Sequence, residues 1–132
     1  MTATATAPAR LNASGNAEVC LIGDHFPEAV LCLLGYSRWH VRLFDDLAAG
    51  LKEIEQGRVA VALCGTKDWR NAVDAARRSS RAPAVIVLAE MPNDSEWLEV
   101  VAAGGIYLPV ANLDAGHLFP LLSLQWRAWH GE

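Results

Sequence analysis

Five short apolar runs, each followed by a segment with helical periodicity, constrain the fold of this chain more than any other feature. The runs are rich in Val, Ile and Leu, which is typical of strands buried on both faces of a sheet. Strands that alternate with helices pair in parallel and place helices on both faces of the sheet. The sequence therefore predicts an α/β fold, a doubly wound five-stranded parallel sheet with five helices.

The expected strand order is 2-1-3-4-5, the flavodoxin-like order. We expect strands at residues 19–23, 41–44, 59–64, 84–89 and 106–110, and helices at 27–34, 47–56, 69–79, 94–104 and 114–129. Either Asp45 or Asp46 caps the second helix, and either Asn93 or Asp94 caps the fourth. Pro120 lies inside the last helical pattern and should kink that helix or delay its start.

The chain has 132 residues, enough for one domain with a single core. Residues 1–17 are mostly small and polar and show no hydrophobic periodicity, so they are interpreted as a disordered N-terminal tail. A transit peptide is the alternative interpretation of this acid-free segment. The folded domain is expected to span residues 18–132.

Charge and cysteine content exclude several classes of function. The net charge is −4, and only Arg77, Arg78 and Arg81 cluster, so we expect no binding of nucleic acid. The apolar runs are too short to cross a membrane.

Three cysteines, Cys20, Cys32 and Cys64, lie in apolar runs without C-x-x-C spacing. We therefore expect buried thiols, a reducing compartment and a cytoplasmic location.

Three motifs carry a resemblance to a known family. They are Gly-Asp-His at 23–25, Val-Ile-Val-Leu-Ala-Glu at 85–90, and Ala-Ala-Gly-Gly-Ile-Tyr-Leu-Pro at 102–109. With the strand lengths, they make residues 18–129 resemble a bacterial response-regulator receiver domain of two-component systems. The resemblance implies a cytoplasmic signalling domain whose phosphotransfer chemistry takes place where the strands end.

That chemistry needs two acidic residues for Mg²⁺, an Asp that accepts the phosphoryl group, a Thr or Ser, and a Lys. According to the resemblance, these positions form a degenerate phosphorylation pocket in this chain. Asp24 keeps one acidic position, and the other four positions carry Gly23, Cys64, Ala89 and Val110. We therefore expect no catalytic residue, no metal, no cofactor and no enzymatic activity.

Within the family, the chain is most similar to the N-terminal domain of flagellar master regulators of the sigma-54 activator class. The similarity lies in Leu63-Cys64-Gly65-Thr66 at the end of the third strand, the short first helix ending at Gly35, and Glu90. It implies a regulatory domain of a transcription regulator. The chain would be either a part of such a regulator or a stand-alone protein.

Two site residues have competing interpretations. Cys64 is expected to be a small core residue, with a redox or metal-sensing thiol as the alternative. Asp24 is expected to cap a turn or helix, with a mixed metal site formed with His25 and Glu90 as the alternative.

Four aromatic residues are candidates for an interaction surface: Trp97, Tyr107, Trp126 and Trp129. Large aromatic side chains anchor protein interfaces. In receivers, the face made by the fourth helix, fifth strand and fifth helix is the usual docking and dimer surface. The equal alternative is that Trp126 and Trp129 only cover the edge of the core. They lie about 60° apart on a helix, so at least one should be partly exposed.

The leading hypothesis is a phosphorylation-independent pseudo-receiver. It would act as a regulatory interaction or dimerisation module in signal transduction or transcription regulation, with a protein partner or a second copy as its partner. The alternative is a sensor of a small nucleotide or metabolite, bound in a neutral pocket lined by Gly23, Cys64, Gly65, Ala89 and Val110.

Overall fold

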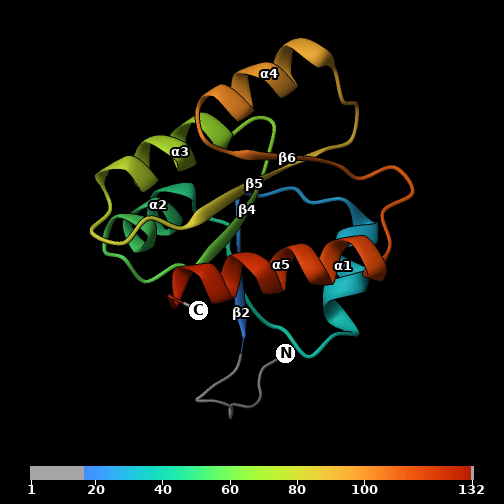
Figure 1. Ribbon diagram of the computed structural model, residues 1–132, viewed down its shortest axis with the longest axis horizontal. Helices are drawn as coiled ribbons and strands as arrows, with labels where there is room; N and C mark the ends of the chain where they lie inside the picture. Colours follow the sequence, from blue (N-terminus) through green and yellow to red (C-terminus); the bar gives the residue numbers. More distant parts are fainter. Residues whose placement is uncertain (1–16, 132) are drawn as a thin grey trace.

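The computed structural model describes residues 17–131 and forms one parallel sheet with helices on both sides (Figure 1). The strands are β2 (Glu18–Ile22), β3 (His40–Phe44), β4 (Val61–Gly65), β5 (Ala84–Ala89) and β6 (Ile106–Pro109). The helices are α1 (Glu28–Gly35), α2 (Leu47–Glu55), α3 (Trp69–Arg78), α4 (Asp94–Ala102) and α5 (Ala115–Trp129). The strand order β3-β2-β4-β5-β6 is the predicted 2-1-3-4-5 order and confirms the fold class.

The predicted N-terminal tail lies outside the described residues except for Ala17. The carbonyl of Ala17 accepts a hydrogen bond of 2.9 Å from the N–H of His40. No helix within the described residues 17–131 is long and apolar enough to span a membrane.

Two helix starts that the sequence left open are decided by side-chain hydrogen bonds. The carboxylate of Asp46 accepts from the N–H of Ala48 at 3.2 Å, so Asp46 caps α2. The amide oxygen of Asn93 accepts from the N–H of Glu96 at 2.8 Å, so Asn93 caps α4. Each cap satisfies a backbone donor that has no partner within its own helix.

Helix α5 begins at Ala115 although it contains Pro120, so of the two expected effects, a kink or a delayed start, the delayed start is wrong. The carboxylate of Asp114 caps the helix by accepting from the N–H of His117 at 3.0 Å. Pro120 removes one helical hydrogen bond. Burial of Leu118 and Leu122 against the sheet offsets that loss and keeps the segment helical.

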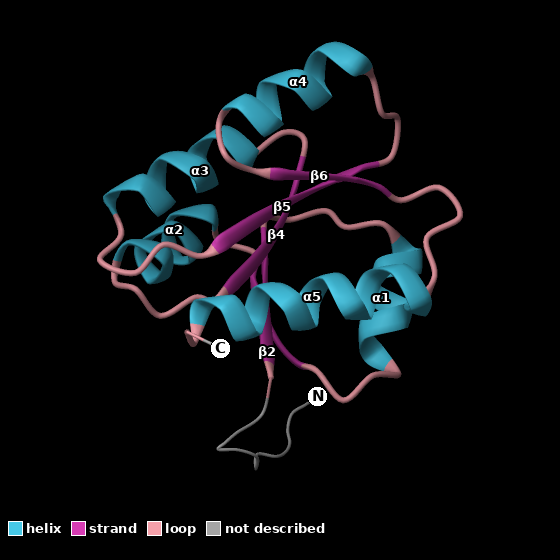
Figure 2. Cartoon of the chain, in the orientation of Figure 1, coloured by secondary structure: helices cyan, strands magenta, loops and turns pink. Residues whose placement is uncertain are grey.

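The core forms two layers, one on each face of the sheet, because alternate strand residues point to opposite sides. On one face, Cys20 and Ile22 pack with side chains from α2, α3 and α4. On the other face, Val19 and Leu21 pack with side chains from α1 and α5. Figure 2 shows this division of the helices between the two faces.

The expectation that all three cysteines are buried is correct for Cys20 and Cys64 and wrong for Cys32. Cys32 lies on α1, whose inward face is made by Val30 and Leu34, so its own side chain points outward. An apolar run in a helix does not specify which of its members faces solvent. Which side of the helix faces the sheet decides which of these residues are buried.

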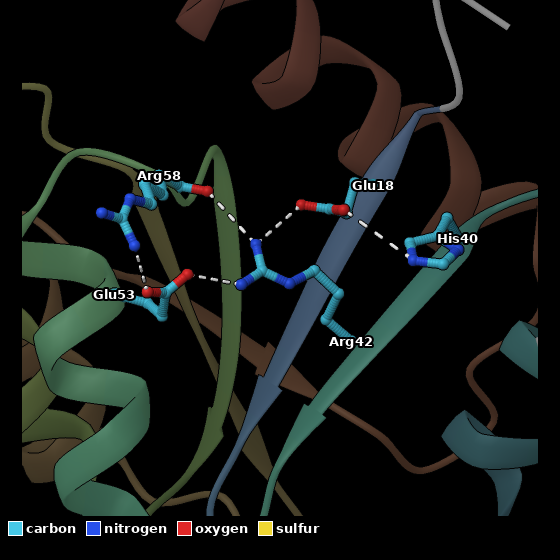
Figure 3. A network of polar contacts seen from close by, with 5 residues as sticks. All are labelled: Glu18, His40, Arg42, Glu53 and Arg58. Atoms are coloured by element: carbon cyan, nitrogen blue, oxygen red, sulfur yellow. Dashed lines mark hydrogen bonds and ion pairs between the residues drawn. The ribbon is translucent and has the colours of Figure 1, made fainter. Parts of the chain in front are cut away.

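A polar network connects the edge strand β3 to its neighbour β2 and to α2 (Figure 3). The guanidinium of Arg42 in β3 donates to Glu18 Oε1 at 3.1 Å and to Glu53 Oε1 of α2 at 2.5 Å. Glu53 Oε2 also accepts from Arg58 at 3.0 Å, and His40 Nε2 lies 3.9 Å from Glu18 Oε2. The hydrogen bond from Arg42 holds the pKa of Glu53 below its ordinary value. The sequence had not singled out any of these residues.

Candidate functional site

Register between the strands brings the predicted pocket positions to one edge of the sheet. Ile22, Cys64 and Val87 lie side by side in β2, β4 and β5. The N–H of Val110 donates to the carbonyl of Ala89 at 3.0 Å just beyond β6. The carboxyl ends of all these parallel strands therefore meet, as the fold requires.

The side chains of Cys64 and Ala89 nevertheless point into the core and have no exposed surface. They belong to the core layer beneath α2, α3 and α4. The Sγ of Cys64 lies 3.8 Å from the carbonyl oxygen of Ile86. Burial raises the pKa of the Cys64 thiol to about 12, so the thiolate is not formed near neutral pH. Val110 packs against the layer on the other face.

A pocket of about 460 Å³ opens at this edge, lined mainly by the loops that follow the strands. Its lining residues are Asp24, His25, Pro27, Gly65, Thr66, Lys67, Asp68, Leu88, Glu90 and Met91. Of the five predicted pocket positions, only Asp24 is among them. The expectation of a neutral lining is wrong, because charged loop residues rather than strand residues form the walls.

One ion pair and one histidine–carboxylate contact connect the loops around the pocket. Lys67 Nζ lies 3.2 Å from Asp24 Oδ1, and His25 Nε2 lies 3.4 Å from Glu90 Oε1. All four side chains are largely exposed. The hydrogen bond from Lys67, together with its positive charge, holds the pKa of Asp24 below the usual range. Asp24 is thus paired with an ammonium group supplied by the loop after β4.

Gly23 is required by its surroundings. Its φ of 129° lies in a region that favours glycine, and a Cβ at this position would lie 3.0 Å from Asp68 Oδ2. An acidic side chain at position 23 would therefore be strained and would also approach the carboxylate of Asp68. Lys67 and Asp68 were missed by sequence reasoning, although their place directly after Gly65-Thr66 at a strand end could have identified them.

The alternative metal site at Asp24, His25 and Glu90 is not assembled. In the part of the chain that the structure describes, no three His, Cys, Asp or Glu side chains gather as candidate metal ligands. Asp24 and Glu90 instead accept contacts from Lys67 and His25.

Two of the four predicted surface aromatics lie together at α4 and β6. The rings of Trp97 and Tyr107 stack with centroids 6.1 Å apart and an interplanar angle of 20°. Tyr107 is buried, and its hydroxyl donates to Glu96 Oε1 at 2.7 Å and accepts from the N–H of Asn93 at 3.3 Å. Burial and the bond to Glu96 raise the pKa of Tyr107. Trp97 is 48% exposed and covers one side of Tyr107.

The other two aromatics lie elsewhere, so the four residues do not form one surface. Trp126 packs edge-on against Trp39, with centroids 6.3 Å apart, in the layer beneath α1 and α5. The guanidinium of Arg81 lies 3.6 Å from the ring centroid of Trp129 and donates to the Trp129 carbonyl at 2.6 Å. Both tryptophans are partly buried, as expected for at least one of them.

The outer side of α4 is apolar and exposed. Leu98 is 71% exposed and Val101 is 53% exposed, next to Trp97. We call these three residues the α4 apolar face. Large exposed hydrophobic groups on neighbouring positions of one helix are typical of contact surfaces. The sequence placed all three on this helix but identified only Trp97 as a surface residue.

No protein-family model matches the chain, and no curated protein matches it by sequence. The sheet order and the loop-lined strand ends define a doubly wound α/β domain with the flavodoxin-like strand order. A CheY-like response regulator receiver domain protein from Methanospirillum hungatei JF-1 is similar in structure, with a TM-score of 0.68 and 14% identity over 89% of this chain and 98% of that one.

A second similar structure is the signal receiver domain of a protein described as a Luxo repressor from Vibrio parahaemolyticus. It has a TM-score of 0.70 and 14% identity, and the match covers 87% of this chain and 93% of that one. At this identity the likeness establishes the fold, which is the receiver fold that the sequence motifs predicted.

Proposed function

We propose that this chain is a phosphorylation-independent pseudo-receiver. It acts as a regulatory module, through protein contacts, in bacterial signal transduction or transcription regulation. The observation that carries the proposal is the complete burial of Cys64 at the position where the resemblance expects the phosphoacceptor Asp. A phosphoacceptor must present an ionised nucleophile to its donor. Cys64 is inaccessible, and its thiol has a pKa raised to about 12.

The partner groups of phosphotransfer are also missing at the expected positions. Ala89 offers no hydroxyl and Val110 offers no cation. The ammonium of Lys67 is paired with Asp24, which is the carboxylate that the resemblance assigns to Mg²⁺ binding. We therefore propose that the domain has no enzymatic activity of its own.

Regulation would pass through the α4 apolar face. Tryptophan is among the residue types that contribute most to protein interfaces, and Trp97 is half exposed on this face. The occupant could be a second copy, giving a homodimer, or another protein. The resemblance of residues 63–66, Gly35 and Glu90 to flagellar master regulators suggests a larger transcription regulator as the setting.

The proposal is tested by incubating the protein with acetyl phosphate and Mg²⁺ and measuring its intact mass. The expected result is an unchanged mass, because no accessible phosphoacceptor is in place. A stable adduct of one phosphoryl group on any residue, including Asp24 or Asp68, would overturn the proposal. Light scattering at high micromolar concentration, with and without Trp97→Ala, tests the homodimer form.

A second candidate function, small-ligand sensing, is favoured by the pocket of about 460 Å³ at the strand ends. Three carboxylates, from Asp24, Asp68 and Glu90, line it with only one ammonium, that of Lys67. This balance disfavours the phosphates of a nucleotide and favours an unphosphorylated metabolite. Thermal-shift screening separates the two functions, since a ligand that binds only the folded state raises the melting temperature. No shift with any compound would count against the sensor.

A further inference from the structure

We propose that the edge strand β3 pairs with β3 of a second copy of this chain, in antiparallel orientation and centred on Leu43, so that the two sheets join into one. This contact lies at the edge of the sheet opposite to β6 and does not use the α4 apolar face. It therefore goes beyond the proposed function and leaves the α4 apolar face free for another protein.

The outer edge of β3 presents backbone groups that can pair with another strand. Among the residues that the structure describes, β3 pairs with β2 alone. The N–H of His40 and the carbonyl of Phe44 form their hydrogen bonds on the β2 side. Because alternate residues of a strand direct their backbone groups to opposite sides, Val41 and Leu43 direct theirs outward. Such groups on an edge strand are a template for a further strand.

The two edges of the sheet are not equally open to pairing. Strand β6 has four residues and ends at Pro109, and proline lacks the N–H that a neighbouring strand would need. Strand β3 has five residues and contains neither proline nor lysine, two residue types that protect exposed edges. Its Leu43 is 60% exposed although it lies within the strand. Pairing is therefore expected at β3 rather than at β6.

The one arginine of β3 is paired within its own chain. The guanidinium of Arg42 donates to Glu18 and to Glu53, so it is directed toward β2 and α2 (Figure 3). Neighbouring residues of a strand point to opposite faces, so Leu43 lies on the other face of the sheet. The charge of Arg42 therefore does not oppose the burial of Leu43 against a second copy.

Charge also selects the register of the two strands. In an antiparallel pair centred on Arg42, the two arginines would lie directly opposite each other, which destabilises the pair. A pair centred on Leu43 places the two copies of Leu43 opposite each other and Arg42 opposite Phe44 of the second copy. An arginine is attracted to an aromatic ring, and two exposed leucines bury each other. The second register is therefore the favoured one.

The two ends of β3 carry opposite charges, which favours the antiparallel orientation. Arg38 precedes the strand, Asp45 and Asp46 follow it, and all three are exposed. An antiparallel pair brings the acidic end of each strand toward the basic end of the other, whereas a parallel pair would bring like charges together. The edge is thus complementary to itself, as a two-fold contact requires.

Sedimentation velocity of the full chain tests the proposal. A contact of one five-residue strand from each copy is small, so we expect a weak dimer whose fraction grows with concentration up to about 1 mM. Leu43→Lys should weaken dimerisation by about fivefold or more, because it places two ammonium groups opposite each other. Leu124→Lys changes a similarly exposed leucine on α5 and should leave the dimer unchanged.

A pair of opposite charges tests the register and controls for misfolding. Leu43→Glu alone should dimerise as poorly as Leu43→Lys. An equimolar mixture of the two variants should form a heterodimer, because the two residues at position 43 face each other in the proposed register. A variant that had failed to fold could not be rescued in this way.

Amide hydrogen exchange identifies what covers the edge. The N–H groups of Val41 and Leu43 should exchange more slowly as the protein concentration rises, because the dimer supplies their hydrogen-bond acceptors. Protection that does not depend on concentration would mean that residues 1–16 of the same chain, rather than a second copy, cover β3. That result would overturn the proposal.

Three further results would overturn it: a monomer at every concentration, a dimer that persists in Leu43→Lys, or a mixture of the charged variants that forms no heterodimer. Loss of the dimer in Trp97→Ala would locate the contact at the α4 apolar face instead. None of these results bears on the pseudo-receiver. A phosphoryl adduct would reject the pseudo-receiver and leave the pairing of β3 standing.

Discussion

The phenol of Tyr107 and the carboxylate of Glu96 are joined by a hydrogen bond of 2.7 Å that connects β6 to the first turn of α4. The same phenol oxygen accepts from the N–H of Asn93, and Asn93 caps α4 through the N–H of Glu96. The orientation of Tyr107 and the start of α4 therefore depend on each other. Rotation of this ring out of the core would break both contacts at the helix start.

Tyr107→Phe should lower the free energy of unfolding by about 1 to 3 kcal/mol, because it leaves Glu96 and the N–H of Asn93 without their buried partner. Urea unfolding followed by circular dichroism measures the loss. Tyr36→Phe is the matched control, since Tyr36 is 95% exposed. Equal stability of the two variants would mean that the hydrogen bonds of Tyr107 contribute nothing.

Gly23→Ala should destabilise the protein by about 1 to 3 kcal/mol, because alanine is strained at a φ of 129° and its Cβ would crowd Asp68. Adding Asp68→Ala should recover only the part caused by crowding. Gly35→Ala is the control, since a Cβ there meets nothing within 4 Å. If Gly23→Ala is as stable as the wild type, the strained conformation is not maintained in solution.

Thiol reactivity should separate the three cysteines. Cys32 is exposed, so it should react with a thiol reagent such as dithionitrobenzoate within minutes at neutral pH, as an ordinary accessible thiol does. Cys20 and Cys64 are buried, and burial raises the pKa of each thiol to about 12. They should react only after unfolding in denaturant. Fast labelling of Cys64 in the native protein would revive the interpretation of this residue as a sensor.

The ion pair of Asp24 and Lys67 predicts a pH dependence. The folded state lowers the pKa of Asp24, so its stabilising effect is present above the unfolded pKa and is lost as the pH falls through the folded pKa. An NMR titration of the Asp24 carboxyl should give a midpoint below the ordinary Asp value. Lys67→Met should move that midpoint back up, and Lys52→Met should not. An unchanged midpoint in Lys67→Met would show that the pair does not form.

The fold was predictable because the alternation of apolar runs and amphipathic segments has few three-dimensional solutions. The strand bounds differ by a few residues at most, and β4 begins at Val61 rather than residue 59 although Val59 is buried. For α2 and α4 the sequence predicted the capping residue only as one of two adjacent candidates. Asn93 and Asp94 are both suitable capping residues, and the hydrogen bond to the N–H of Glu96 identifies Asn93 as the cap.

The site was less predictable because alternate residues of a strand point to opposite faces of the sheet. Only the position of a residue within the folded strand decides whether its side chain enters the pocket or the core. The resemblance located Cys64 and Ala89 at the correct edge, but the alternation of the strands points both side chains into the core. The pocket walls come from loop residues such as Lys67 and Glu90. Similarly, Trp126 and Trp129 lie apart from Trp97 because α5 packs on the face of the sheet opposite α4.

The close approach of Asp68 to Gly23 also limits how this sheet edge can change during evolution. The two residues are far apart in sequence, yet the side chain of Asp68, together with the positive φ of Gly23, limits which side chains position 23 can accept. A substitution that introduces a carboxylate at position 23 would be tolerated better after Asp68 had changed and the backbone there had relaxed. The order of mutations, and not only their identity, would therefore influence which sequences remain accessible to this domain.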